Sequence, residues 1–125
     1  MKRVGRVSVL NVAVSVVMAT VDEIGDSNLL STAVNATYEQ DTQTIRLNKD
    51  SCSEPTAAWH YLLHELGHAW FAISGARHYL RSKLGMTPEQ FDVVEDDLID
   101  MLSPAINSSF SELKTISAAL SKACK

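Results

Sequence analysis

The segment spanning residues 59–73 constrains the fold most, because it sorts its side chains by face at the helical period of 3.6 residues. Its apolar side chains fall on one broad face of a helical wheel and comprise Trp59, Leu62, Leu63, Leu66, Ala69, Trp70 and Ile73. Its histidines and one glutamate fall on the other side and comprise His60, His64, Glu65 and His68. A helix with such a face must pack against another layer, so the sequence predicts a core helix with a polar border.

The polar border of this helix has the residue types and spacing of a metal site. His64 and His68 are one helical turn apart, so their rings stand side by side and one helix can supply two ligands to a zinc ion. Glu65 lies next to them, where a carboxylate can take a proton from a water that attacks a carbonyl. The alternative is an ordinary amphipathic helix with histidines facing solvent, which is what we expect of His60. Gly67 costs about 1 kcal/mol relative to Ala inside a helix, which predicts a close backbone approach or a substrate strand at this point.

The chain before this helix predicts strands. Residues 6–20 are apolar on both faces, as in one long strand or two shorter ones that are covered on both sides. Residues 22–32 have the composition of a loop. Residues 38–47 predict a hairpin with its turn near residues 40–42.

The remainder of the chain predicts helices. The histidine-bearing helix is expected to begin near residue 53, with a proline in its first turn, and to stop at Gly75. A capping box at residues 87–90 starts a second helix that reaches about residue 102. Residues 77–85 connect the two helices and can include a helical turn, and a third helix is expected over residues 105–123. Strands followed by helices predict a small α+β domain.

Composition and charge indicate one globular domain over residues 1–125, with 46% apolar and 21% charged residues. The net charge is −4 and there is no basic stripe, so we expect no nucleic-acid partner. The apolar run at residues 7–19 is short and interrupted by polar residues, so we expect no membrane span and a cytoplasmic location, with secretion as the lesser alternative. Cys52 and Cys124 are expected to be two reduced thiols.

A catalytic zinc usually has a third protein ligand, and the acidic helix at residues 88–102 offers one. Glu95 lies in the middle of its apolar arc, which comprises Phe91, Val94, Leu98, Ile99, Met101, Leu102 and, if the helix does not bend at Pro104, Ile106. A carboxylate buried there without a partner would be costly, and a metal ion removes that cost, so Glu95 is the predicted third ligand. Asp92 is the second choice, either as ligand or as a group that orients a ligand histidine.

Other residues of the acidic helix and its approach have lesser expected roles. Asp97 and Asp100 lie opposite the apolar arc and are expected to face solvent, whereas Asp96 lies with Asp92 at its edge. His78 and Tyr79 follow the first helix, on a segment that can fold back toward the metal and donate to an oxyanion. We expect instead an ordinary surface histidine and a packed tyrosine.

The segment Leu62–Trp70, together with the strand at residues 41–47, resembles the small zincin-like metallopeptidases found in phages and prophages. It is similar in outline to the gluzincin group, in which a glutamate on the following helix completes the site. The resemblance implies a minimal zincin fold, a hairpin strand near Ile45 at the edge of the sheet, and a peptide substrate lying along that edge. It departs from that pattern at Ile99, where the group often has an aspartate.

The sequence therefore predicts a zinc-dependent peptidase in which His64, His68 and Glu95 bind the metal and Glu65 is the general base. Its partner is a protein or peptide substrate, and the sequence leaves its oligomeric state open. The alternatives are a non-catalytic zinc protein, whose site would be closed by four protein ligands, and an interaction module that keeps the fold without turnover.

Overall fold

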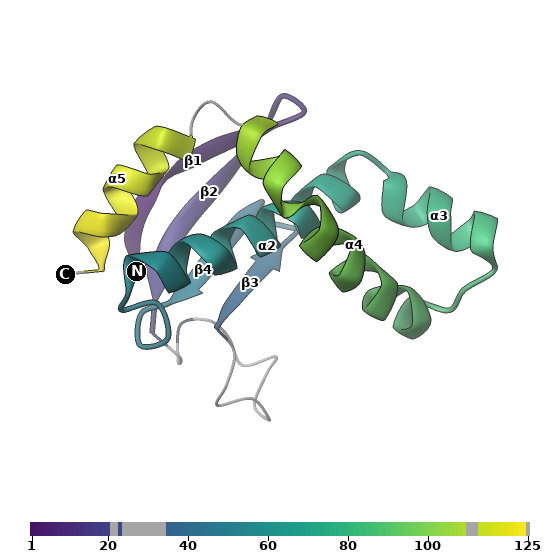
Figure 1. Cartoon of the computed structure of the whole chain (residues 1–125), viewed down its shortest axis with the longest axis horizontal. Coiled ribbons are helices and arrows are strands. Elements are labelled where there is room, and N and C mark those ends of the chain that lie inside the picture. Colours follow the sequence, from purple (N-terminus) through teal and green to yellow (C-terminus); the bar gives the residue numbers. More distant parts are fainter. Residues whose placement is uncertain (21–22, 24–34, 110–112, 125) are drawn as a thin grey trace.

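The computed structural model describes residues 1–20, 23, 35–109 and 113–124, and it has an α+β fold with an N-terminal sheet followed by helices (Figure 1). The strands are β1 (Lys2–Val9), β2 (Val12–Ala19), β3 (Ala36–Glu39) and β4 (Thr44–Asn48). The helices are α2 (Pro55–Ile73), α3 (Ala76–Leu84), α4 (Pro88–Ser109) and α5 (Leu113–Ala123). The predicted fold class is thus confirmed, while most of the loop predicted at residues 22–32 lies outside the described residues.

The first apolar segment forms two strands, joined by a two-residue turn. Leu10 has a φ of 49° and Asn11 a φ of 69°, and two successive positive φ angles are the conformation of a tight hairpin turn. The second hairpin, β3–β4, lies where the alternating segment predicts it, and the two strands pair antiparallel. Of the two predicted alternatives for residues 6–20, two shorter strands are therefore correct.

The four strands have the order β1-β2-β4-β3, in which β2 and β4 run parallel and the other two pairs are antiparallel. Ile45 lies in β4, between β2 and β3, so the expectation of an edge strand near Ile45 is wrong. The edge strand is β3, because β2 pairs with the side of β4 that faces away from β3.

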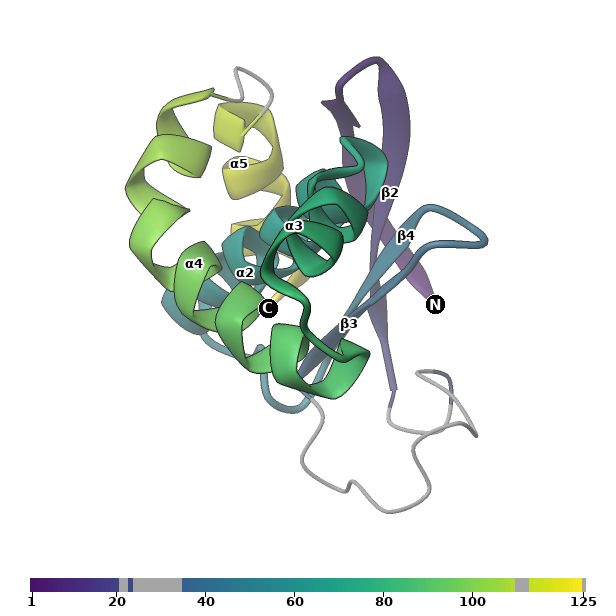
Figure 2. The ribbon, with the colours of Figure 1, turned by 90° about the vertical axis from the view of Figure 1, so that its right-hand side faces the viewer.

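The described helices lie on one face of the sheet (Figure 2), so the predicted cover on both sides of the first strands is not found within the described part of the chain. Alternate residues of the first hairpin are buried under the helices, and these are Val7, Val9, Val14 and Val16. Between them, Ala13 is exposed, and Ser15 and Val17 are half-buried. Apolar side chains on the second face are few enough to remain partly in contact with water.

Helix α2 begins at Pro55 and ends before Ser74 and Gly75, in agreement with the prediction. Most of its predicted core face packs on the sheet, where Leu62, Leu66 and Ala69 have no exposed surface. Trp70 is an exception at 36% exposed, because it lies in the last turn of the helix and its ring stacks edge-on against Phe71.

The segments after α2 differ from the prediction in three places. Residues 76–84 form helix α3, which is longer than the single helical turn allowed for in the connecting segment, and its ends are marked by Gly75 and Gly85 with φ angles of 78° and 63°. Helix α4 begins at the predicted capping box, with hydrogen bonds of 3.0 and 3.2 Å between Thr87 and Gln90. It then continues through Pro104 to Ser109. The last helix accordingly begins at residue 113, later than expected.

Over the part of α4 whose side chains the structure describes, the helix buries a narrow stripe against α2, which comprises Phe91, Glu95 and Ile99. The side chain of Ile106 lies outside the described residues. Met101 and Leu102 are 77% and 41% exposed, so their assignment to the apolar arc is wrong. Within this contact, a Cβ added to Gly67 would lie 2.6 Å from Cγ2 of Ile99, closer than carbon atoms pack. The predicted close approach at Gly67 is confirmed, and its partner is α4.

The two cysteines are free, as expected. Cys52 is fully buried in the core, and the thiol of Cys124 at the end of α5 donates a hydrogen bond of 2.9 Å to the carbonyl oxygen of Cys52. Burial, together with the neighbouring Cys124, raises the pKa of Cys52 to about 11.

Candidate metal centre

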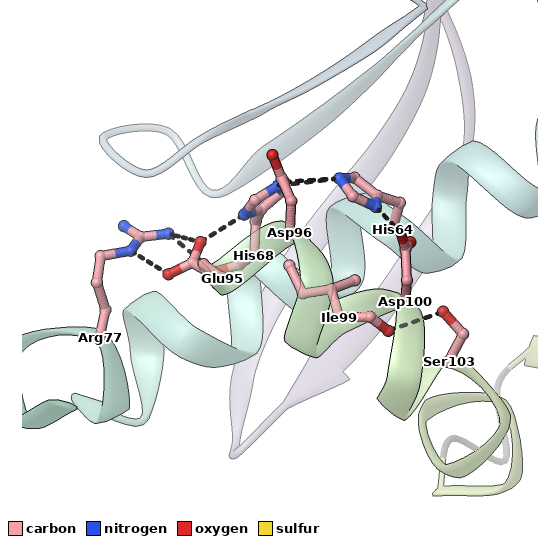
Figure 3. A network of polar contacts seen from close by, with 8 residues as sticks. All are labelled: His64, His68, Arg77, Glu95, Asp96, Ile99, Asp100 and Ser103. Atoms are coloured by element: carbon pink, nitrogen blue, oxygen red, sulfur yellow. Dashed lines mark hydrogen bonds and ion pairs between the residues drawn. The ribbon is translucent and has the colours of Figure 1, made fainter. Parts of the chain in front are cut away.

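Two histidines of α2 and one aspartate of α4 converge on one point (Figure 3). The Nε2 atoms of His64 and His68 are 3.2 Å apart, and Oδ1 of Asp96 lies 3.1 Å from each of them. The three residues form a group that can hold a metal ion. The helical spacing predicted from the sequence thus brings His64 and His68 together, and α4 adds a carboxylate.

The other nitrogen of each histidine faces a carboxylate of α4. Nδ1 of His68 is 2.5 Å from Oε2 of Glu95, and Nδ1 of His64 is 3.4 Å from Oδ1 of Asp100. A carboxylate that is hydrogen-bonded to Nδ1, as Glu95 is to His68, holds the hydrogen there and leaves the lone pair on Nε2. The ring of His68 is therefore oriented for coordination through Nε2, and the ion pair with Asp100 lies on the corresponding side of His64.

Glu95 is buried, as the sequence predicts, with 2% of its surface exposed. Its two oxygens accept hydrogen bonds of 2.7 and 2.9 Å from Nε and Nη2 of Arg77. The predicted ligand Glu95 therefore lies behind His68, and the carboxylate that meets both Nε2 atoms is that of its neighbour Asp96.

Burial and neighbouring charges act against each other on the ionisable groups of the site. Burial would raise the pKa of Glu95, but the hydrogen bonds from His68 and Arg77 lower it to about 2, so Glu95 is a carboxylate. Burial would lower the pKa of His68, but the hydrogen bond with Glu95 and the charges of Glu65, Glu95 and Asp96 raise it. Burial raises the pKa of Glu65, and the two histidines counteract this only in part.

Glu65 lies between two open recesses beside the histidine pair. One recess, of about 490 Å³, is lined by Ala36, Thr37, Tyr38, Gln40, Glu65, His68, Arg77, Asp92, Glu95 and Asp96. The other, of about 310 Å³, is lined by Asn35, Ala36, His60, Tyr61, His64, Glu65 and Asp100. Glu65 is 8% exposed and belongs to both, so its carboxyl group borders the space on either side of the histidines. Strand β3 contributes Ala36, Thr37 and Tyr38 to the lining of the larger recess.

The remaining predicted residues lie near the centre or away from it. His60 is exposed, as expected, and lines the smaller recess. Asp92 lines the larger recess one helical turn before Asp96, outside the convergent group. His78 and Tyr79 are exposed on α3 and are not among the lining residues of either recess.

Sequence reasoning missed three residues, namely Asp96, Asp100 and Arg77. Asp96 and Asp100 are four residues apart on α4, and this spacing matches that of His64 and His68 on α2. This match in spacing is a signal from which the two aspartates could have been paired with the two histidines. Arg77 carries no such signal, because its approach to Glu95 depends on how the chain turns at Gly75 between α2 and α3.

Within the described residues, no helix is both long and apolar enough to cross a membrane. Comparison of the chain with protein-family models, with curated proteins and with solved structures finds no match to any of them.

Proposed function

We propose that the protein is a zinc-dependent peptidase in which His64, His68 and Asp96 bind the metal and Glu65 is the general base. The observation that carries the proposal is the convergence of two Nε2 atoms and one carboxylate oxygen, 3.1–3.2 Å apart. In a tetrahedral zinc site with bonds of about 2.0–2.1 Å, adjacent ligand atoms are about 3.3 Å apart. The donors thus need little movement to accept the ion.

The three donors found among the described residues support a catalytic centre over a structural one. Structural zinc sites are closed by four protein ligands, whereas catalytic sites have three and keep a position for water or substrate. When bound, zinc supplies Lewis acidity and lowers the pKa of a coordinated water to about 7. Glu65 adds a buried carboxyl group whose pKa is raised, that is, shifted toward neutral pH, where a general base works best.

The edge of the sheet provides a place for the peptide. Among the strands of the described part of the chain, β3 pairs with β4 alone, and it borders the larger recess with Ala36, Thr37 and Tyr38. A peptide in extended conformation can add to this edge through backbone hydrogen bonds. Its carbonyl groups would then pass His68 and Glu65, which line the same recess.

Metal binding is tested by titrating zinc into metal-free protein against a chromophoric chelator. Wild type should bind one ion, and Asp96→Asn should weaken binding by more than about 100-fold, beyond the 10- to 100-fold typical of groups that only orient a ligand. Asp92→Asn is the matched control, since it removes a carboxylate from the same recess one helical turn away. Equal affinity of the two variants would remove Asp96 from the ligand set.

Catalysis is tested with Glu65→Gln, which preserves the shape of the side chain and removes the base. We expect this variant to retain zinc and to lose cleavage of a peptide library by at least about 100-fold, the contribution typical of general base catalysis. Equal cleavage by wild type and variant contradicts the assigned role of Glu65. Zinc binding by wild type without cleavage of any peptide favours the alternative of a non-catalytic zinc protein.

A further inference from the structure

We propose that Arg77 is a positioning residue of the metal centre, which acts on His68 through Glu95. This inference rests on the proposed metal site and adds a residue from a third helix to it. Figure 3 shows the chain of contacts, in which Arg77 meets both oxygens of Glu95 and Glu95 meets the ring of His68 on the side away from Asp96.

The contacts leave Glu95 little freedom. Nε and Nη2 of Arg77 donate to its two oxygens at 2.7 and 2.9 Å, which is the paired geometry that an arginine fork makes with a carboxylate. Nη2 also lies 3.4 Å from the carbonyl oxygen of His68, so the guanidinium bridges the ligand's own backbone and the carboxylate on its ring. With Glu95 only 2% exposed, Arg77 replaces the water that would otherwise hold this carboxylate.

The consequence for His68 follows from the geometry of its ring. A carboxylate fixed opposite Nδ1 keeps the hydrogen on Nδ1 and the lone pair on Nε2, where His64 and Asp96 converge. Without Arg77, Glu95 would keep one hydrogen bond and could rotate. Both the tautomer and the direction of the His68 ring would then be less well defined.

The fold supplies Arg77 through a local device. Gly75 has a φ of 78°, a left-handed conformation that ends α2, and Arg77 follows two residues later at the start of α3. No residue of α3 is buried. Arg77 therefore reaches the site from a helix that contributes nothing else to the core.

Charge alone predicts the opposite effect, which makes the proposal testable. Arg77 places a positive charge near a site for a divalent cation, so its removal should strengthen zinc binding if only the field matters. If Arg77 acts by holding Glu95, its removal should weaken binding, as loss of groups that orient a ligand does by 10- to 100-fold.

The experiment measures zinc affinity of Arg77→Gln, Arg77→Lys and wild type by competition with a chelator. The matched control is Arg81→Gln, one helical turn along α3, because Arg81 is not among the residues that line the recesses or form the convergent group. Nitrogen-15 NMR of the metal-free proteins, in alkaline buffer where the imidazole is neutral, reports the tautomer of His68 without any metal.

We expect about 10- to 100-fold weaker zinc binding for Arg77→Gln, an intermediate loss for the lysine variant and no change for the Arg81 control. The NMR spectrum should show the Nδ1–H form of His68 in wild type and a mixture of tautomers in Arg77→Gln. Unchanged or tighter zinc binding by Arg77→Gln, or an unchanged tautomer, overturns the inference and leaves the proposed metal site standing. If wild type binds no zinc, the proposed function fails, and the tautomer still decides the role of Arg77.

Discussion

Replacement of Gly67 by alanine tests whether the approach of α4 to α2 assembles the proposed metal centre. A methyl group at this position would lie 2.6 and 2.7 Å from Cγ2 and Cγ1 of Ile99, and 3.2 Å from its Cβ. Carbon atoms pack at about 3.5–4.0 Å, so Ile99 must move away by about 1 Å. Ile99 is fully buried, and we expect α4 to move with it.

The size of the effect differs between stability and metal binding. Overpacking of a core typically costs about 1–3 kcal/mol, and alanine recovers about 1 kcal/mol of helix propensity, so the net loss of stability should be about 0–2 kcal/mol. Asp96 is on the same helix, three residues before Ile99. A shift of about 1 Å would separate its carboxylate oxygen from both Nε2 atoms, which now lie 3.1 Å away. The loss in the free energy of zinc binding should therefore exceed the loss in the free energy of unfolding.

The assay is a double-mutant cycle of Gly67→Ala with Ile99→Ala, read by urea denaturation and by zinc titration. Ile99→Ala removes Cγ1 and Cγ2, the two closest atoms, at an expected cost of about 2–5 kcal/mol for the cavity. In the double variant the methyl group introduced at position 67 occupies part of that cavity. The double variant should therefore lose about 1–3 kcal/mol less stability than the two single variants lose together. Zinc affinity should recover in the same double variant.

Two results would refute this reasoning. If Gly67→Ala binds zinc as wild type does, the position of α4 does not determine the site. If the two substitutions are additive within about 0.5 kcal/mol, the methyl group does not meet Ile99.

The remaining predictions concern the ends of α3 and the buried thiol. Gly85→Ala should lower the free energy of unfolding by about 1 kcal/mol, because Gly85 has a φ of 63° and an alanine is strained in this conformation. The added Cβ would have no atom within 4 Å, so a clash does not contribute. An unchanged urea midpoint would contradict this. Cys52 should resist iodoacetamide in the folded protein, because it is buried and its pKa is raised to about 11. Cys124 should react first, and mass spectrometry of the labelled peptides distinguishes the two cysteines. Equal labelling rates would contradict the burial of Cys52. Because the folded pKa of Cys52 lies above the ordinary 9.0, the stability due to its burial should be present below pH 9 and lost as the pH rises through about 11.

The local parts of the fold were predictable from sequence because they depend on neighbouring residues. The capping box of Thr87 and Gln90 needs only its own helical turn, and the glycine at position 75 needs only the end of its helix. The same holds for His64 and His68, whose proximity follows from the helical period. Each of these features appears in the structure at the predicted residues.

Features that depend on tertiary packing were less predictable. The insertion of β2 beside β4 is a parallel pairing between distant segments, and it decides that β3 is the edge strand. Pattern alone also placed Met101 in the apolar arc of α4, although the helix contacts α2 through a stripe too narrow to include it. Which part of an apolar face is buried depends on the partner's width, which periodicity does not encode.

The choice between Glu95 and Asp96 shows how burial and coordination separate. A buried carboxylate needs a compensating charge, and Glu95, which is 2% exposed, has one. The sequence favours a metal ion as that charge, whereas the structure supplies Arg77. Once Arg77 neutralises Glu95, the carboxylate with a free path to both Nε2 atoms is the more exposed Asp96. A metal ligand must keep a lone pair directed at the space that the ion would occupy. The buried Glu95 is therefore suited to orient a ligand histidine, and the neighbouring Asp96 is suited to bind the ion.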